Sequence, residues 1–295
     1  MANDTRTLAL AIELFDLDNQ ARRLTVATRK NYNHILSQFL SWCSEQSIDL
    51  LTEITAVSVR RYLAGMANRG LSGTYQHNHY RALRTFFVYC VRDELLAASP
   101  MRQVRAPKVE QKLPKVFGAG DIETILKACE TLRDRTICLF LLDSGLRAAE
   151  LCSLDVGDID MQSGVVVVEK GKQQKERIVI VGAQVRKLYR RYLAQRRRPG
   201  PSAPAFVAER GGDRLTVNAL IQLMRRLRLA SGIENCSAHT FRRTFATNSL
   251  RSGINIYVLA KLMGHSDIQV LRRYLEISQE DLEEAHRQHG PVDKL

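Results

Sequence analysis

Apolar residues recur at intervals of three and four along most of this chain, and that spacing restricts its fold more than any other feature. Such spacing forms one apolar stripe on an amphipathic helix. In the first hundred residues it predicts helices near residues 7–15, 25–43, 57–66 and 72–90. No alternating strand pattern precedes residue 160. The first part of the chain is therefore predicted to be a helical domain.

Three prolines interrupt the helical pattern between residues 100 and 114, in a stretch rich in lysine and arginine. Proline lacks a backbone N–H and biases the residue before it toward extended backbone. We therefore expect an interdomain linker at residues 104–117. It would join a domain at residues 1–103 to a second domain at residues 118–275.

The second domain contains the clearest strand signal, in which the run Val165–Val168 and the run Arg177–Val181 flank the turn Gly171–Gln174. This pattern predicts a small β-hairpin. The remaining pattern predicts helices near residues 119–130, 134–143, 183–196, 216–230, 240–251, 255–262 and 267–275. The predicted fold class is mainly α, with the hairpin making the second domain α+β.

The charge of the chain favours a polyanionic partner. Lysine and arginine number 44 against 31 aspartates and glutamates, which gives a net charge of +13. The excess is present in both predicted domains, so both are expected to face the same nucleic acid. The alternative is charge that serves solubility alone.

Composition excludes several other classes of protein. Hydrophobic residues make up 45% of the chain, which argues against a disordered protein. No apolar run reaches the ~18 residues of a membrane-spanning helix, and the first residues do not resemble a signal peptide. The six cysteines form no CxxC pair, so neither a zinc site nor a disulfide framework is expected. They are expected to be reduced and buried, as in a cytosolic protein.

Arg147 follows a glycine at the end of an apolar helix, in the stretch GLRAAEL. A guanidinium in that position is partly buried and needs an anionic partner. Glu150 can supply it within the chain, and an anionic ligand is the alternative. In HTFRR, His239 and Arg242 share one face if a helix opens there. A phosphate at the helix N-terminus would satisfy both, whereas a solvated basic face is the alternative.

Two further polar residues lie near the C-terminus. His265 lies between Gly264, which is typical of a helix end, and Ser266–Asp267, which is typical of the next N-cap. Tyr274 follows nine residues later in the stretch RRY. Taken alone, a tyrosine on a helix is more typical of a core or an interface.

The order of these stretches is more informative than any one of them. GLRAAEL, EKGKQQKERIVI, HTFRRTFAT, LMGHSD and RRY together resemble the tyrosine recombinases, also called the phage integrase family. The stretches YNHILSQFLSWC and LSGTYQHNHYRALRTFFVYCVRDELL resemble the SAM-like helical core-binding domain of that family. The resemblance covers about residues 8–295 and implies a simple Xer-like member without an arm-binding domain.

The resemblance implies catalytic roles for individual residues. Tyr274 would attack the scissile phosphate, while Arg147 and Arg242 would hold its non-bridging oxygens. His239 would donate a hydrogen bond near the phosphate, and His265 would support the transition state. Whether Tyr274 acts on its own subunit's site or on a neighbour's stays open.

The resemblance also implies that a lysine in the hairpin turn protonates the leaving 5′ oxygen. Anchoring on the following Lys175-Glu176-Arg177 selects Lys172, with Lys170 and Lys175 as the alternatives. No metal or nucleotide motif is visible. We therefore expect catalysis without cofactor or metal.

The implied function is site-specific DNA recombination through a 3′-phosphotyrosine intermediate, for integration and excision or for dimer resolution. The alternatives are a type IB topoisomerase and a non-catalytic DNA-binding protein of the same fold. The implied partner is double-stranded DNA with an inverted-repeat core site, bound by a homotetramer on two sites or by a heteromer with a paralogue. The acidic tail at residues 276–295 would dock on a neighbouring protomer. The expected location is the cytoplasm, at the nucleoid of a bacterium or archaeon, with no membrane contact.

Overall fold

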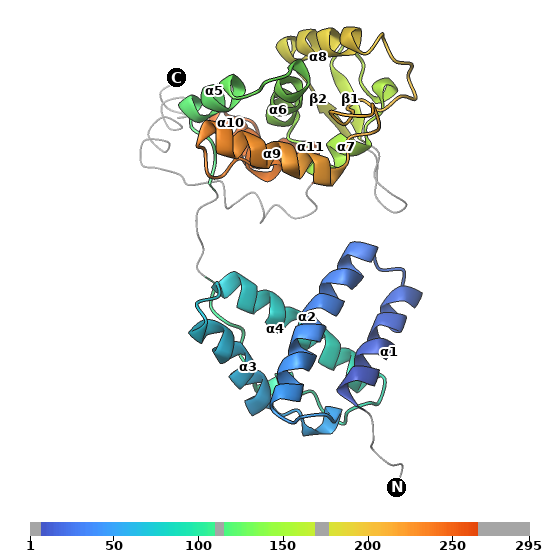
Figure 1. The fold of residues 1–295 in the computed structure, drawn as a ribbon, viewed down its shortest axis with the longest axis vertical. Coiled ribbons are helices and arrows are strands. Elements are labelled where there is room, and N and C mark those ends of the chain that lie inside the picture. Colours follow the sequence, from blue (N-terminus) through green and yellow to red (C-terminus); the bar gives the residue numbers. More distant parts are fainter. Residues whose placement is uncertain (1–6, 110–114, 169–176, 265–295) are drawn as a thin grey trace, which may run out of the picture. The chain divides into compact units, whose positions relative to one another are not determined.

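The computed structural model describes residues 7–109, 115–168 and 177–264, and every helix predicted within them is present (Figure 1). The helix predicted at residues 267–275 lies outside the described residues. The chain divides into two compact units, residues 1–112 and 113–295, and each is described by itself.

Over residues 7–109, the first unit has four α-helices and two short 3₁₀ helices around one apolar core. They are α1 (Leu8–Ala21), α2 (Val26–Glu45), η1 (Leu51–Glu53), α3 (Ala56–Asn68), α4 (Gly73–Arg92) and η2 (Pro100–Gln103).

Helix α2 shows how the sequence specifies this unit. The Thr25 side chain accepts a hydrogen bond from the Thr28 backbone N–H at 3.2 Å, which caps the first turn. The apolar stripe then buries Leu36, Phe39 and Cys43 completely. The sequence thus specifies both the start of α2 and the face that it buries.

The two ends of the predicted linker belong to different cores. Met101 and Val104 are buried in the core of the first unit. Phe117 is buried in the core of the second unit, where its backbone N–H donates to the Thr244 hydroxyl at 2.9 Å. Both flanks of the proline-rich stretch are therefore fixed to one unit each.

The second unit holds the remaining elements. They are α5 (Ala119–Lys127), α6 (Leu132–Ser144), α7 (Ala148–Ser153), η3 (Val156–Asp158), β1 (Val165–Val168), β2 (Arg177–Ile180), α8 (Ala183–Gln195), α9 (Val217–Ser231), α10 (Ala238–Arg251) and α11 (Ile256–Met263). Strands β1 and β2 are antiparallel, with Val165 opposite Ile180 and Val168 opposite Arg177. The predicted fold class is therefore confirmed: a mainly helical chain whose second unit contains a β-hairpin.

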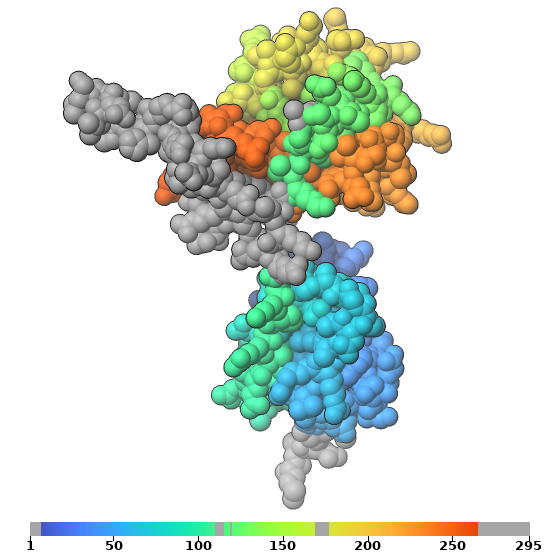
Figure 2. All heavy atoms as spheres, turned by 90° about the vertical axis from the view of Figure 1, so that its left-hand side faces the viewer, coloured from blue at the N-terminus to red at the C-terminus, as the bar shows by residue number. Residues whose placement is uncertain are grey.

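Helix α6 lies at the centre of the second unit, with α8 on one side and α10 on another. Its residues Ile137, Phe140 and Leu141 are completely buried. In both views the yellow residues, which include α8, form one end of the unit (Figure 2). The C-terminus of α6 is thereby brought to the side of the unit formed by α7, α10 and α11.

Two local features differ from the prediction. Helix α7 was not predicted, because it is only six residues long and its N-cap is Arg147, a residue type that does not usually cap helices. Helix α10 begins earlier than predicted, because the Ser237 hydroxyl accepts from the Thr240 backbone N–H at 3.1 Å and so caps it.

All six cysteines are free thiols, and all but Cys129 are buried. Within the described ranges, no helix is both long enough and apolar enough to cross a membrane.

Candidate active site

The turn between α6 and α7 positions Arg147. Helix α6 ends with Gly145 in the left-handed conformation, at a φ of 60°. A side chain at Gly145 would overlap the Phe245 ring on α10, so the turn requires glycine for space as well as for conformation. Leu146 is then completely buried, and Arg147 becomes the N-cap of α7.

Arg147 makes contacts within the chain and remains accessible. Its backbone N–H donates to Glu150 Oε2 at 2.7 Å, and its Nη1 donates to Glu150 Oε1 at 2.8 Å. Its Nη2 donates to the Gly264 carbonyl at 3.1 Å. The side chain is nevertheless 42% exposed, so an anion from solvent can reach it. Of the two partners considered for Arg147, the internal carboxylate is present and leaves room for the external one.

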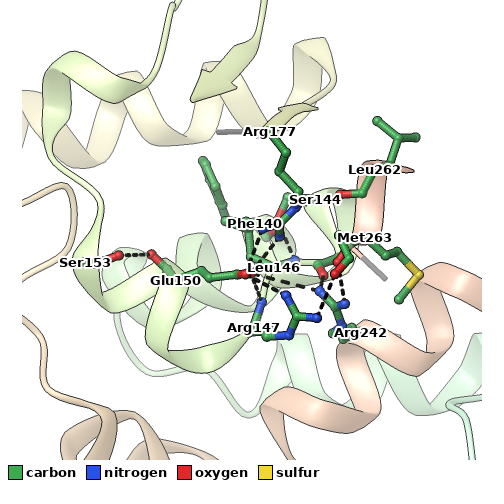
Figure 3. A network of polar contacts seen from close by, with 12 residues as sticks. Phe140, Ser144, Leu146, Arg147, Glu150, Ser153, Arg177, Arg242, Leu262 and Met263 are labelled. Carbon is green, nitrogen blue, oxygen red and sulfur yellow. Dashed lines mark hydrogen bonds and ion pairs between the residues drawn. The ribbon is translucent and has the colours of Figure 1, made fainter. Parts of the chain in front are cut away.

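Arg242 approaches the same place from α10. Its Nη1 donates to the Gly145 carbonyl at 2.6 Å, and its Nη2 donates to the Met263 carbonyl at 2.7 Å. Its Nη1 lies 4.0 Å from Glu150 Oε2. Only 5% of the Arg242 side chain is exposed. The two predicted arginines are therefore brought together around one carboxylate (Figure 3).

A third arginine completes this cluster. Arg177, the first residue of β2, donates from Nη1 and Nη2 to the two carboxylate oxygens of Glu150, at 2.7 Å each. Its Nε donates to the Leu262 carbonyl at 2.8 Å. In the sequence, Arg177 serves only as an anchor for aligning the hairpin lysine, and no local pattern indicates a role for it at the site.

The end of α11 is where the three arginines converge. Helix α11 ends with Gly264 in the left-handed conformation, at a φ of 63°. The carbonyls of Leu262, Met263 and Gly264 accept hydrogen bonds from Arg177, Arg242 and Arg147 respectively. The last carbonyls of a helix lack partners within it and carry the negative end of its dipole. Guanidiniums are therefore held at this helix end by electrostatics as well as by geometry.

Glu150 stays ionised within the cluster. Burial by itself raises the pKa of its carboxyl, but the hydrogen bonds from Arg177 and Arg147 outweigh burial and lower that pKa to about 2. Three guanidiniums against one carboxylate give the cluster a net charge of +2. This arrangement is suited to bind an anion.

His239 lies in the first turn of α10, one helical turn before Arg242. Its side chain is exposed. The pKa of the imidazole is lowered mainly because part of the ring is packed against protein atoms, and further by the positive charges of Arg243 and Arg242. The imidazole is therefore neutral at pH 7 and can form hydrogen bonds without adding charge. The other predicted site residues, Lys172, His265 and Tyr274, lie outside the described residues.

The described part of the chain contains no group of three or more histidine, cysteine, aspartate or glutamate side chains arranged to hold a metal ion. At the end of α11, the described charged groups that converge are Arg147, Arg177, Arg242 and Glu150.

Two family models match the chain. The phage integrase family model matches residues 115–281, and the N-terminal SAM-like domain model of phage integrases matches residues 12–96. The chain is 32% identical to the tyrosine recombinase XerD of Pseudomonas aeruginosa over 273 residues, which cover 90% of this chain and 91% of that protein. It is 33% identical to the tyrosine recombinase XerC of Myxococcus xanthus, with the same coverage.

Solved structures agree on the fold. The Tn1549 transposon integrase in complex with transposon right end DNA superposes with a TM-score of 0.79 at 16% identity, over 96% of this chain and 99% of that one. The paired arginines, the small hairpin and the SAM-like helical unit thus define a tyrosine-type site-specific recombinase. The chain belongs to the phage integrase family.

Proposed function

We propose that this recombinase cleaves one DNA strand by attack of Tyr274 on a phosphodiester held by Arg147 and Arg242. The Tyr274 phenol releases its proton to solvent and its oxygen bonds to phosphorus. The bond to the 5′ oxygen breaks, and the strand is left as a 3′-phosphotyrosine ester with a free 5′ hydroxyl. Lys172 supplies the proton to the departing oxygen, and His239 and His265 assist at the phosphate. A 5′ hydroxyl from a second strand then attacks the ester and releases Tyr274.

The observation that supports this proposal most directly is the convergence of Arg147 and Arg242. Arg242 donates to the carbonyl two residues before Arg147, and the two side chains donate to the successive carbonyls of Met263 and Gly264. A phosphodiester repels nucleophiles because its oxygens are negative, and still more charge gathers on them in the pentacoordinate transition state. Planar guanidiniums keep their charge at any working pH and offer paired donors to such oxygens.

The proposed reaction cycle requires no cofactor as a source of energy. A phosphodiester is exchanged for a phosphotyrosine ester of similar energy, so no nucleotide hydrolysis has to drive the reaction. Tyrosine has an ordinary pKa of about 10, and nearby positive charge lowers the cost of forming the phenolate. Loss of one preorganised donor in a comparable oxyanion site costs about 3 kcal/mol.

The assembly is proposed from the family. We infer a homotetramer on two inverted-repeat core sites, or a heteromer with a paralogue, acting at the nucleoid in the cytoplasm. Residues 1–103 would bind DNA as the core-binding domain, joined by the linker at residues 104–117 to the catalytic domain at residues 118–275. The tail at residues 276–295 would dock on a neighbouring protomer. Integration, excision or dimer resolution of a replicon or mobile element would each use this assembly.

Covalent trapping tests the chemistry. The DNA sequence that the pure chain selects from a random pool is rebuilt as a nicked suicide duplex, from which the cleaved end is lost. The unmodified chain is expected to form an SDS-resistant, protease-sensitive adduct, and Tyr274→Phe is expected to form none. Tyr257→Phe is the matched control, because Tyr257 is an exposed tyrosine of the same unit. No adduct from the unmodified chain, or a full yield from Tyr274→Phe, would contradict the proposal.

A two-site substrate separates recombination from its alternatives. Exchange of the DNA flanking the two sites is expected. Relaxation of supercoils without exchange would identify a topoisomerase. Binding without any adduct would identify a non-catalytic DNA-binding protein.

A further inference from the structure

Arg177 is not among the six residues assigned to catalysis, yet its side chain is buried, as that of Arg242 is. It also donates hydrogen bonds directly to Glu150, the carboxylate that holds Arg147. We propose that Arg177 is a positioning residue, which fixes Glu150 and the end of α11 and thereby sets the orientation of Arg147. This inference rests on the proposed function, because it concerns the rate of strand cleavage at that site.

The first argument is the geometry of the carboxylate. Arg177 binds both oxygens of Glu150 through a two-pronged contact, at 2.7 Å on each side. Such a contact fixes the plane of the carboxylate as well as its position. The same two oxygens accept the backbone N–H and Nη1 of Arg147. The orientation of Arg147 therefore depends on how Arg177 holds Glu150.

The second argument is the contact with α11. Arg177 Nε donates to the Leu262 carbonyl, and the next two carbonyls of that helix end accept from Arg242 and Arg147. One guanidinium thus joins β2, α7 and α11 (Figure 3). If Arg177 let the end of α11 shift, the supports of both phosphate-binding arginines would shift with it.

The third argument is the position of these contacts in the sequence. Arg177 follows Lys172 by five residues and pairs with Val168 at the end of the two strands nearest the turn. Leu262 precedes His265 by three residues. The hydrogen bond from Arg177 to the Leu262 carbonyl therefore connects the strand that follows Lys172 with the helix end that precedes His265.

A lysine at position 177 distinguishes positioning from charge alone. Lysine retains the positive charge that Glu150 needs, but its single nitrogen cannot reproduce a planar fork on two oxygens together with a third bond to Leu262. A displacement of about 1 Å at a reacting group costs about 100-fold in rate. Arg177→Lys is therefore expected to slow cleavage by about that factor.

The experiment measures single-turnover cleavage of the suicide duplex at saturating protein. For Arg177→Lys we expect a rate constant reduced about 100-fold, an unchanged final amount of adduct, and a Kd for the duplex within about threefold of the original. Arg226→Lys is the matched control. Arg226 also binds a fully buried carboxylate, that of Asp134, which lies in the first turn of α6, at the opposite end of that helix from Gly145. Its substitution should leave the rate constant unchanged.

A second variant covers the case in which a lone lysine is not tolerated. The double substitution Glu150→Gln with Arg177→Met leaves no unpaired buried charge at the pair, and it should fold and cleave slowly. If Arg177→Lys reduces only the amount of adduct, or if the double variant cleaves at the original rate, Arg177 has a structural role alone and the inference is overturned. No adduct from the unmodified chain would instead overturn the proposed function, which makes the two failures distinguishable.

Discussion

Replacing Glu150 by glutamine tests whether the arginine cluster depends on a buried carboxylate. The pKa of this carboxyl is about 2 in the folded protein, against an ordinary value of 4.5. Each tenfold change in an acid constant corresponds to about 1.4 kcal/mol. At neutral pH the ionised carboxylate therefore contributes roughly 3 kcal/mol to the free energy of unfolding.

The pH dependence of that contribution has a definite sign. Because the pKa is lower in the folded state, the contribution is complete above pH 4.5 and is lost as the pH falls toward 2. Glutamine resembles the protonated acid. The difference in unfolding free energy between the unmodified chain and Glu150→Gln should therefore be roughly 3 kcal/mol at pH 7 and should shrink by about 1.4 kcal/mol per pH unit below pH 4.5.

Urea unfolding of the full chain can measure this difference in unfolding free energy, because two spectroscopic signals distinguish the first unit from the second. The single tryptophan, Trp42, lies in the first unit, so its fluorescence reports that unit and should be unaffected by Glu150→Gln. Far-ultraviolet circular dichroism follows both units, and the additional transition belongs to the second. A difference that stays the same at pH 7 and pH 3.5 would refute the assignment of Glu150 as a carboxylate held by guanidiniums.

Three further outcomes follow from the structure. Gly145→Ala should lower the melting temperature of the second unit and slow cleavage, because alanine at a φ of 60° is strained by about 1–2 kcal/mol and its methyl group overlaps Phe245. Burial lowers the pKa of His79 to about 4. The free energy of unfolding of the first unit should therefore fall by roughly 3 kcal/mol as the pH falls from 6.5 to 4, as measured by Trp42 fluorescence during urea unfolding. His79→Phe should abolish that pH dependence. Arg147→Ala should reduce the single-turnover cleavage rate by about 100- to 1,000-fold, while duplex affinity changes far less, as measured by suicide-substrate trapping and fluorescence anisotropy.

Much of the fold follows from local patterns in the sequence. The described helices other than α7 were predicted because they bury apolar stripes at helical spacing. Most of them follow a threonine, serine or asparagine whose side chain caps the first turn. The hairpin was predicted because valines and isoleucines flank a polar turn. These signals are local, so they can be recognised in the sequence without knowledge of the tertiary structure.

Arg177 shows where local patterns fail. Along β2 the buried positions are Arg177 and Val179, whereas Ile178 and Ile180 are more than half exposed. Because the exposed positions are apolar, the alternation that would have assigned Arg177 to the buried face is hidden. Its partner Glu150 was foreseen only for Arg147, since the contact from β2 depends on tertiary packing.

The charge of the cluster has a consequence for catalysis. Arg177 and Glu150 neutralise each other through their two-pronged contact, so the net charge of +2 corresponds to Arg147 and Arg242. His239 is neutral at pH 7 and leaves this sum unchanged. A bound phosphodiester carries one negative charge, and the pentacoordinate transition state of the proposed reaction carries two. Arg147 and Arg242 therefore already exceed the single negative charge of the substrate before the proposed Lys172 is counted. Only interactions that strengthen in the transition state accelerate the chemical step. Two helix C-termini, those of α6 and α11, supply the partial negative charge that keeps the two guanidiniums together before DNA arrives.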